Sequence, residues 1–121
     1  MTGKIRNFQD LEVWQRAHQL VLDVYRATRD FPADEGCGLA AQTRKVAVSV
    51  PANIAAGFGR RDKEDKIFYY SNSEAYLEEL KYYLILSEDL GHLSGMEQLM
   101  EDAETITRML GGLVRSIESR E

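Results

Sequence analysis

Apolar residues recur along most of the chain at alternating steps of three and four, which is the spacing of one face of an α-helix. No stretch shows the sustained alternation that indicates a half-buried strand. The spacing predicts four helices, over residues 10–29, 39–57, 63–90 and 94–117. Short connections make consecutive helices antiparallel, so we predict an all-α, up-down-up-down four-helix bundle. At 121 residues, the chain is expected to form a single domain over residues 1–121.

Each predicted helix has an apolar seam that should face the core. In the first helix this seam is Leu11, Trp14, His18, Val21, Tyr25 and Thr28. In the third helix the main stripe is Tyr69, Tyr76, Leu77, Leu80, Tyr83, Leu84 and Leu90. The fourth seam is Met96, Leu99, Ala103, Ile106, Leu110, Leu113 and Ile117. His18 is accordingly interpreted as a hydrogen-bonded core histidine rather than a metal or haem ligand.

A proline interrupts the second helical pattern, in the stretch VSVPANIAAGFGRR. An interior proline removes one backbone hydrogen bond and bends a helix. Because the apolar spacing continues on both sides, we predict a helix kinked at Pro51. The alanines and Gly57 should let another helix approach closely, and Gly57 and Gly59 should end the helix. The segment GFGRR lacks the lysine and hydroxyl residue of a phosphate-binding loop, and no strand precedes it.

Local signals also mark the ends of the other helices. Asp62 is a plausible N-cap for the third helix, and Gly91 closes it. Ser94, with Glu97 three residues later, matches the capping-box pattern and predicts the start of the fourth helix.

The net charge is −5, but the charges are unevenly distributed. The region from residue 44 to 66 is rich in cations, whereas residues 67–107 are acidic apart from Lys81. The candidate nucleic-acid-binding residues are Arg44, Lys45, Arg60, Arg61, Lys63 and Lys66. If they converge, they could contact phosphates. The alternative is a solvated face with local ion pairs to Asp62, Glu64 and Asp65.

A second apolar patch lies on the third helix, away from its main stripe. It consists of Phe68, Ala75, Tyr82 and Leu86. A bundle helix needs only one buried stripe, so the patch indicates contact between protomers. The alternative is a central third helix that buries both of its sides within one chain.

Candidate chemistry is sparse. Cys37 is the only cysteine and lies between two glycines, so we expect an inert thiol and a reducing, cytoplasmic location. Two histidines are too few for the usual bundle metal site. Glu79 is interpreted as an ion-pair partner of a basic residue such as Arg44. The alternative is that Glu79 is a catalytic carboxylate. Asn53 must find a partner if it is buried. The sequence predicts no enzyme, no cofactor, no metal and no small-molecule substrate.

The longest stretch without charge, residues 46–59, is too short to span a bilayer, so no membrane association is expected.

Four segments of the chain resemble a known family: FQDLEVWQRAHQL, FPADEGCGLAAQTRKVAVSVPANIAAGFGR, EELKYYLILSEDLGHL and MLGGLVRSI. The family comprises four-helix-bundle proteins encoded in intervening sequences of bacterial 23S ribosomal RNA genes, sometimes labelled S23 ribosomal proteins. The chain departs from the usual family pattern at Ala56, where glutamate is common, and at Ala75 and Tyr76, where Gly-Ser is common.

The resemblance implies a small, non-catalytic bundle. Some members resemble homopentameric rings, and the related accessory variability protein of diversity-generating retroelements is a basic pentamer that works with a reverse transcriptase and its RNA. The resemblance therefore implies a homo-oligomer, with a pentamer favoured, that associates with RNA or a ribonucleoprotein. The alternative is a protein–protein assembly module that does not bind nucleic acid.

Overall fold

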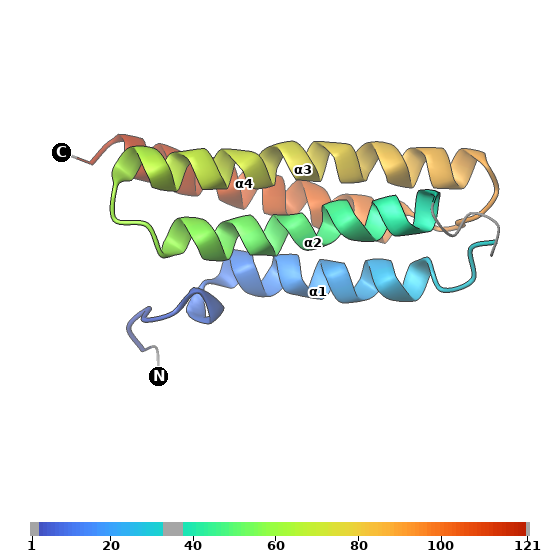
Figure 1. Ribbon diagram of the computed structural model, residues 1–121, viewed down its shortest axis with the longest axis horizontal. Helices are drawn as coiled ribbons and strands as arrows, with labels where there is room; N and C mark the ends of the chain where they lie inside the picture. The colour runs from blue at the N-terminus through green and yellow to red at the C-terminus, as the bar shows by residue number, and fades with distance from the viewer. Residues whose placement is uncertain (1–2, 33–37, 121) are drawn as a thin grey trace.

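Four long helices run side by side along the length of the molecule (Figure 1). The computed structural model describes residues 3–32 and 38–120, so Cys37 lies outside the described residues. After a short 3-10 helix, η1 (Phe8–Asp10), come α1 (Glu12–Ala27), α2 (Leu39–Phe58), α3 (Lys63–Asp89) and α4 (Glu97–Glu118). The predicted number and order of helices are confirmed.

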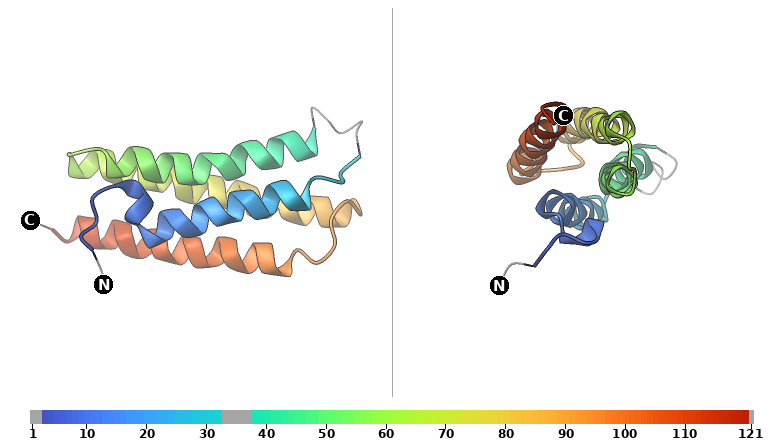
Figure 2. Two further views of the ribbon diagram at one scale, coloured as in Figure 1. Left: turned by 90° about the horizontal axis from the view of Figure 1, so that it is seen from below. Right: turned by 90° about the vertical axis from the view of Figure 1, so that its left-hand side faces the viewer.

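The helices pack as a square. Within the described residues, α1 and α3 each contact α2 and α4, whereas the diagonal pairs do not pack against each other. The α2–α3 pair has the most extensive contact. This arrangement confirms the antiparallel up-down bundle. It also places the N-terminal segment, the α2–α3 turn and the C-terminus at one end of the molecule (Figures 1 and 2).

The core is built from aliphatic side chains of all four helices. Its largest fully buried members are Ile54, Leu77, Leu80, Leu84, Ile106 and Leu110. The predicted seam of α4 is confirmed, because Leu99, Ala103, Ile106, Leu110 and Ile117 are all buried. α3 differs from the prediction, since Tyr70, Ser73 and Ser87 are buried while Leu90 is exposed.

The predicted seam of α1 is correct only in part, because Val21 and Thr28 are buried whereas His18 and Tyr25 are exposed. The buried residues are Val13, Ala17, Leu20, Val21 and Val24. His18 is exposed and stacks on Trp14, with ring centroids 5.0 Å apart, so it is not a core histidine. Small and aliphatic side chains fit the narrow space at the centre of the bundle. The larger amphipathic rings instead cover its edge, where their polar atoms reach water.

α2 continues through Pro51 without a break, as the apolar spacing on both sides predicted. Polar groups of both helices supply hydrogen bonds beside the proline. Ser73 Oγ of α3 donates to the Val50 carbonyl at 2.8 Å, and Asn53 Nδ2 donates to the Ser49 carbonyl at 2.8 Å. The Asn53 side chain also accepts a 3.4 Å hydrogen bond from Asn72 of α3. The half-buried Asn53 is therefore partnered, as the sequence required.

The helix ends follow the predictions only in part. Gly91 has a φ of 80°, and the His92 N–H donates to the Ser87 carbonyl at 2.9 Å, which closes α3 as expected. Gly59 ends α2 but keeps a right-handed φ of −76°. The predicted capping box at Ser94 is wrong, because α4 begins at Glu97 without a side-chain cap. Asp62 precedes α3 at the N-cap position, but its side chain makes no capping hydrogen bond.

Gly57 of α2 lies directly against Tyr69 and Tyr70 of α3, so its substitution should be costly. A Cβ atom at this position would lie 2.8 Å from Tyr70 Cε1 and 3.1 Å from Tyr69 Cβ. We expect Gly57→Ala to lower the free energy of unfolding by about 1–3 kcal/mol, the usual cost of overpacking a core. Urea unfolding of the variant measures this change.

Gly59→Ala is the matched control. A Cβ there would meet only backbone oxygens at 3.7 and 3.8 Å, which is ordinary contact. With a right-handed backbone, alanine should be neutral or stabilising by up to about 1 kcal/mol. Equal effects of the two substitutions would contradict the close approach at Gly57.

Candidate nucleic-acid interface

The structure separates the six candidate cations into two groups. Arg44 and Lys45 lie in the first half of α2, and the other four surround the α2–α3 turn. At about 1.5 Å per residue, roughly 20 Å of helix separates Arg44 from the end of α2. The bundle therefore brings together Arg60, Arg61, Lys63 and Lys66, but not Arg44 and Lys45.

Arg44 has an internal role. Its Nε donates to Thr28 Oγ1 at 2.8 Å and its Nη2 to the Tyr25 carbonyl at 3.3 Å. The guanidinium also lies 4.7 Å from the centroid of the Tyr25 ring. These contacts join α2 to the last turn of α1, so the proposed ion pair between Arg44 and Glu79 is wrong. Glu79 is exposed.

The α2–α3 turn presents two exposed arginines. Arg60 Nη2 lies 3.5 Å from Asp65 Oδ2, and both side chains are about half exposed. Such an exposed pair is weak and is screened by salt, so Arg60 can exchange it for a phosphate. Arg61 is exposed and forms no hydrogen bond or ion pair with any residue that the structure describes. Both line a shallow hollow of about 310 Å³ beside Asp62.

The two lysines of the turn hold this end of the bundle together. Lys63 Nζ donates to the carbonyls of Glu118 and Arg120 at 3.3 and 2.9 Å, and so joins α3 to the chain after α4. Lys66 Nζ donates to the carbonyls of Gly57 and Phe58 at 3.3 and 3.0 Å. A cation at these carbonyls complements the negative end of each helix dipole. Partial burial, and then the charge of Arg120, lower the pKa of Lys66.

The bundle adds cations that the sequence-based prediction missed. Arg115 and Arg120 come from the end of α4, and Lys4 and Arg6 come from the N-terminal segment, which lies at the same end (Figure 2). We call this region the basic end and define it by Lys4, Arg6, Arg60, Arg61, Lys63, Lys66, Arg115 and Arg120. They narrowly outnumber the nearby described acidic residues, which are Asp10, Glu12, Asp62, Glu64, Asp65, Glu74 and Glu118. The up-down topology is the signal that could have found the four missed residues.

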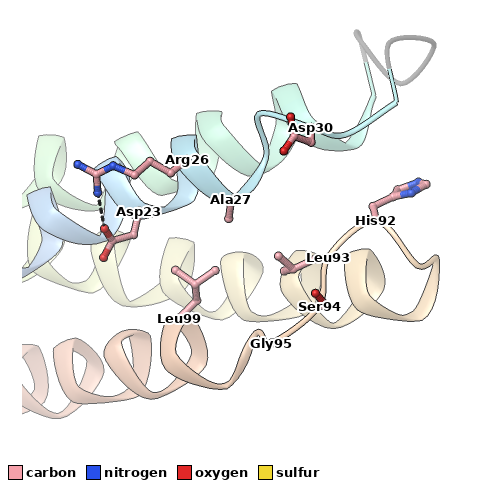
Figure 3. Close-up of a pocket in the computed structure, with 9 residues that line it drawn as sticks. All are labelled: Asp23, Arg26, Ala27, Asp30, His92, Leu93, Ser94, Gly95 and Leu99. Atoms are coloured by element: carbon pink, nitrogen blue, oxygen red, sulfur yellow. Dashed lines mark hydrogen bonds and ion pairs between the residues drawn. The ribbon is translucent and has the colours of Figure 1, made fainter.

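The other end of the bundle is acidic. Its described acidic residues are Asp23, Asp30, Glu78, Glu79, Glu88, Asp89, Glu97, Glu101, Asp102 and Glu104. An open hollow of about 510 Å³ lies there between α1 and the α3–α4 turn (Figure 3). Arg26 lines this hollow, and its Nη1 donates a hydrogen bond to Asp23 Oδ1 at 2.9 Å. The described cations at this end, which include Arg26, Arg29, Arg44 and Lys45, are fewer than its acidic residues, so charge is unevenly distributed along the molecule.

The second apolar patch lies on the outer face of α3. Phe68 and Tyr82 are 59% and 57% exposed, Ala75 is exposed, and Leu86 is half-buried. The alternative in which α3 buries both of its sides within one chain is therefore wrong. Apolar residues also reach the surface nearby at Val48 and Ile85.

Residues 3–32 and 38–120 contain no group of three or more His, Cys, Asp or Glu side chains placed to hold a metal ion. None of the helices described is long and apolar enough to cross a membrane.

A protein-family model matches most of the chain. The model of a family described as 23S rRNA-intervening sequence protein matches residues 9–112, which confirms the resemblance seen in the sequence. None of the curated proteins matches the chain. The matched region includes the α2–α3 turn, whereas Lys4, Arg6, Arg115 and Arg120 of the basic end lie outside it.

Proposed function

This chain belongs to the 23S rRNA-intervening sequence protein family, and we propose that it is a non-enzymatic module that binds structured RNA, alone or in a ribonucleoprotein, through its basic end. The observation that carries the proposal is the separation of charge along the bundle. A net charge of −5 would disfavour RNA binding if it were spread evenly. Here many of the described acidic residues lie at the far end, and cations outnumber acidic residues at the basic end.

Phosphate contact is assigned first to Arg60 and Arg61. A guanidinium presents a planar set of donors that matches a phosphate group, and both side chains are exposed. The neighbouring lysines hold the helix ends through hydrogen bonds to backbone carbonyls and lie beside the two arginines. Arg115 and Arg120 extend this surface toward the C-terminus.

The test is a titration of a labelled RNA hairpin with the purified protein, followed by fluorescence anisotropy at several salt concentrations. Binding should weaken as salt rises, with a slope of log K against log salt of about −0.7 to −0.9 for each phosphate that the protein neutralises. Absence of binding at the lowest salt concentration would refute the proposal.

A second candidate function is protein–protein assembly through the outer face of α3. The observation that favours it is the alignment of Phe68, Ala75, Tyr82 and Leu86 on one exposed face. Exposed apolar rings of this kind are typical of interfaces between protomers. The family resemblance favours a homo-oligomer, and within it a pentamer. This assembly can exist with or without RNA binding.

Replacing Tyr82 with aspartate tests the assembly surface. A carboxylate at the centre of an apolar interface is unfavourable, so the variant should dissociate to a smaller species. Light scattering of wild type and variant measures the mass. Because Tyr82 is largely exposed in one chain, the helical circular dichroism should be unchanged. An unchanged mass of a wild-type oligomer, or a monomeric wild type, would exclude this surface.

A further inference from the structure

A pocket of about 340 Å³ opens at the basic end, between the N-terminal segment and the adjoining ends of α2, α3 and α4. Its volume falls in the range of small-ligand sites. Its walls are mostly apolar, with cations among them. The lining residues are Ile5, Leu11, Phe58, Lys66, Tyr70, Leu113, Ile117 and Arg120.

Tyr70 gives this pocket an unused polar group. Only 2% of the residue is exposed, yet its hydroxyl forms no hydrogen bond with any described residue. No described side-chain oxygen is both sealed from solvent and unpartnered, so the hydroxyl opens onto the pocket. Burial raises the pKa of Tyr70, which keeps the hydroxyl protonated and able to donate. Because the hydroxyl reaches the pocket, a water molecule or a ligand group there can complete its hydrogen bond.

The charged lining residues are both cations. Lys66 is anchored by its bonds to the α2 carbonyls, and Arg120 lies close enough to influence the pKa of both Lys66 and Tyr70. A ligand suited to this pocket therefore combines a flat or apolar body, a polar edge and a negative group. A nucleotide has all three features.

We propose that this pocket accepts one unpaired base of the bound RNA. The base lies against Phe58 and Leu113, its polar edge meets the Tyr70 hydroxyl, and its phosphate lies beside Lys66 and Arg120. Unpaired bases in RNA loops are commonly recognised by insertion against aromatic side chains, whereas paired bases cannot leave the helix cheaply. The inference rests on the proposed RNA binding and adds a preference for unpaired nucleotides.

The experiment compares two labelled RNAs of equal length, a hairpin with an unpaired loop and a fully paired duplex, in the same anisotropy assay. Wild type should bind the hairpin about tenfold more tightly, because one inserted base adds stacking to the phosphate contacts. Leu113→Trp, which fills the pocket, should remove this preference and leave duplex binding unchanged. Leu90→Trp, at the acidic end, is the control and should keep the preference.

Tyr70→Phe removes only the hydroxyl, which holds no hydrogen bond within the described residues, and should leave the fold intact. It should weaken hairpin binding by about three- to tenfold, as expected for one neutral hydrogen bond, and leave duplex binding unchanged. Equal binding of hairpin and duplex by wild type, or an undiminished preference in Leu113→Trp, would overturn the pocket assignment while the RNA-binding proposal stands. Failure to bind either RNA would refute both.

Discussion

Replacing Leu80 with alanine is expected to lower the free energy of unfolding by about 2–5 kcal/mol. Leu80 lies on α3 at the centre of the bundle and is 0% exposed. Its truncation removes buried methyl groups and leaves a cavity that four packed helices cannot fully close. Because a domain of this size is stable by only about 5–15 kcal/mol, the loss should be a large part of the total.

Leu90→Ala is the matched control for this prediction. Leu90 is the same residue type at the end of the same helix, but it is 52% exposed. Its substitution should change the free energy of unfolding by no more than about 0.5 kcal/mol. Chemical unfolding followed by circular dichroism measures both variants. A small effect at Leu80, or a large one at Leu90, would contradict the orientation of α3.

Reversing both arginines of the α2–α3 turn, in the double variant Arg60→Glu and Arg61→Glu, is expected to weaken RNA binding by about a hundredfold or more. A hydrogen bond to a charged group contributes about 1.5–3 kcal/mol, and each 1.4 kcal/mol is tenfold in affinity. The salt dependence should also become shallower, by about one unit of slope for each phosphate that the variant no longer binds. Anisotropy titration at matched salt concentrations measures both quantities.

The double variant Arg29→Glu and Lys45→Glu makes the same change in net charge away from the basic end. Both side chains are exposed, and neither forms an ion pair with a described residue. This variant should lose far less affinity. Equal losses in the two variants would mean that RNA responds to the total charge of the protein rather than to its basic end.

The number, order and direction of the helices could be predicted from the sequence. Apolar spacing indicates where the helices lie, glycines mark where they end, and short connections make consecutive helices antiparallel. The register of α1 could not be predicted. Two stripes compete there at the same spacing, one with Trp14 and Tyr25 and the other with Val13 and Val24. The spacing alone does not choose between them, and in the structure the aliphatic side chains occupy the core.

The candidate site was predictable only in part. The cations around the α2–α3 turn are adjacent in sequence, so their clustering follows directly. Arg44 was misleading, because its partners, Thr28 and the Tyr25 carbonyl, lie on a different helix and no sequence pattern marks them. Arg120 and Tyr70 line the same pocket because the N-terminal segment and the ends of α2, α3 and α4 meet there. This proximity can be seen only in the three-dimensional structure.

The most direct test of the account is to map which end of the bundle touches RNA. Ultraviolet cross-linking of the protein to a bound hairpin, followed by mass spectrometry of the peptides, identifies the contacts. We predict cross-links within residues 58–70 and 113–120, which include Phe58, Tyr70 and the two arginines of the turn. Cross-links confined to the acidic end, around residues 88–104, would contradict the central claim that the basic end binds RNA.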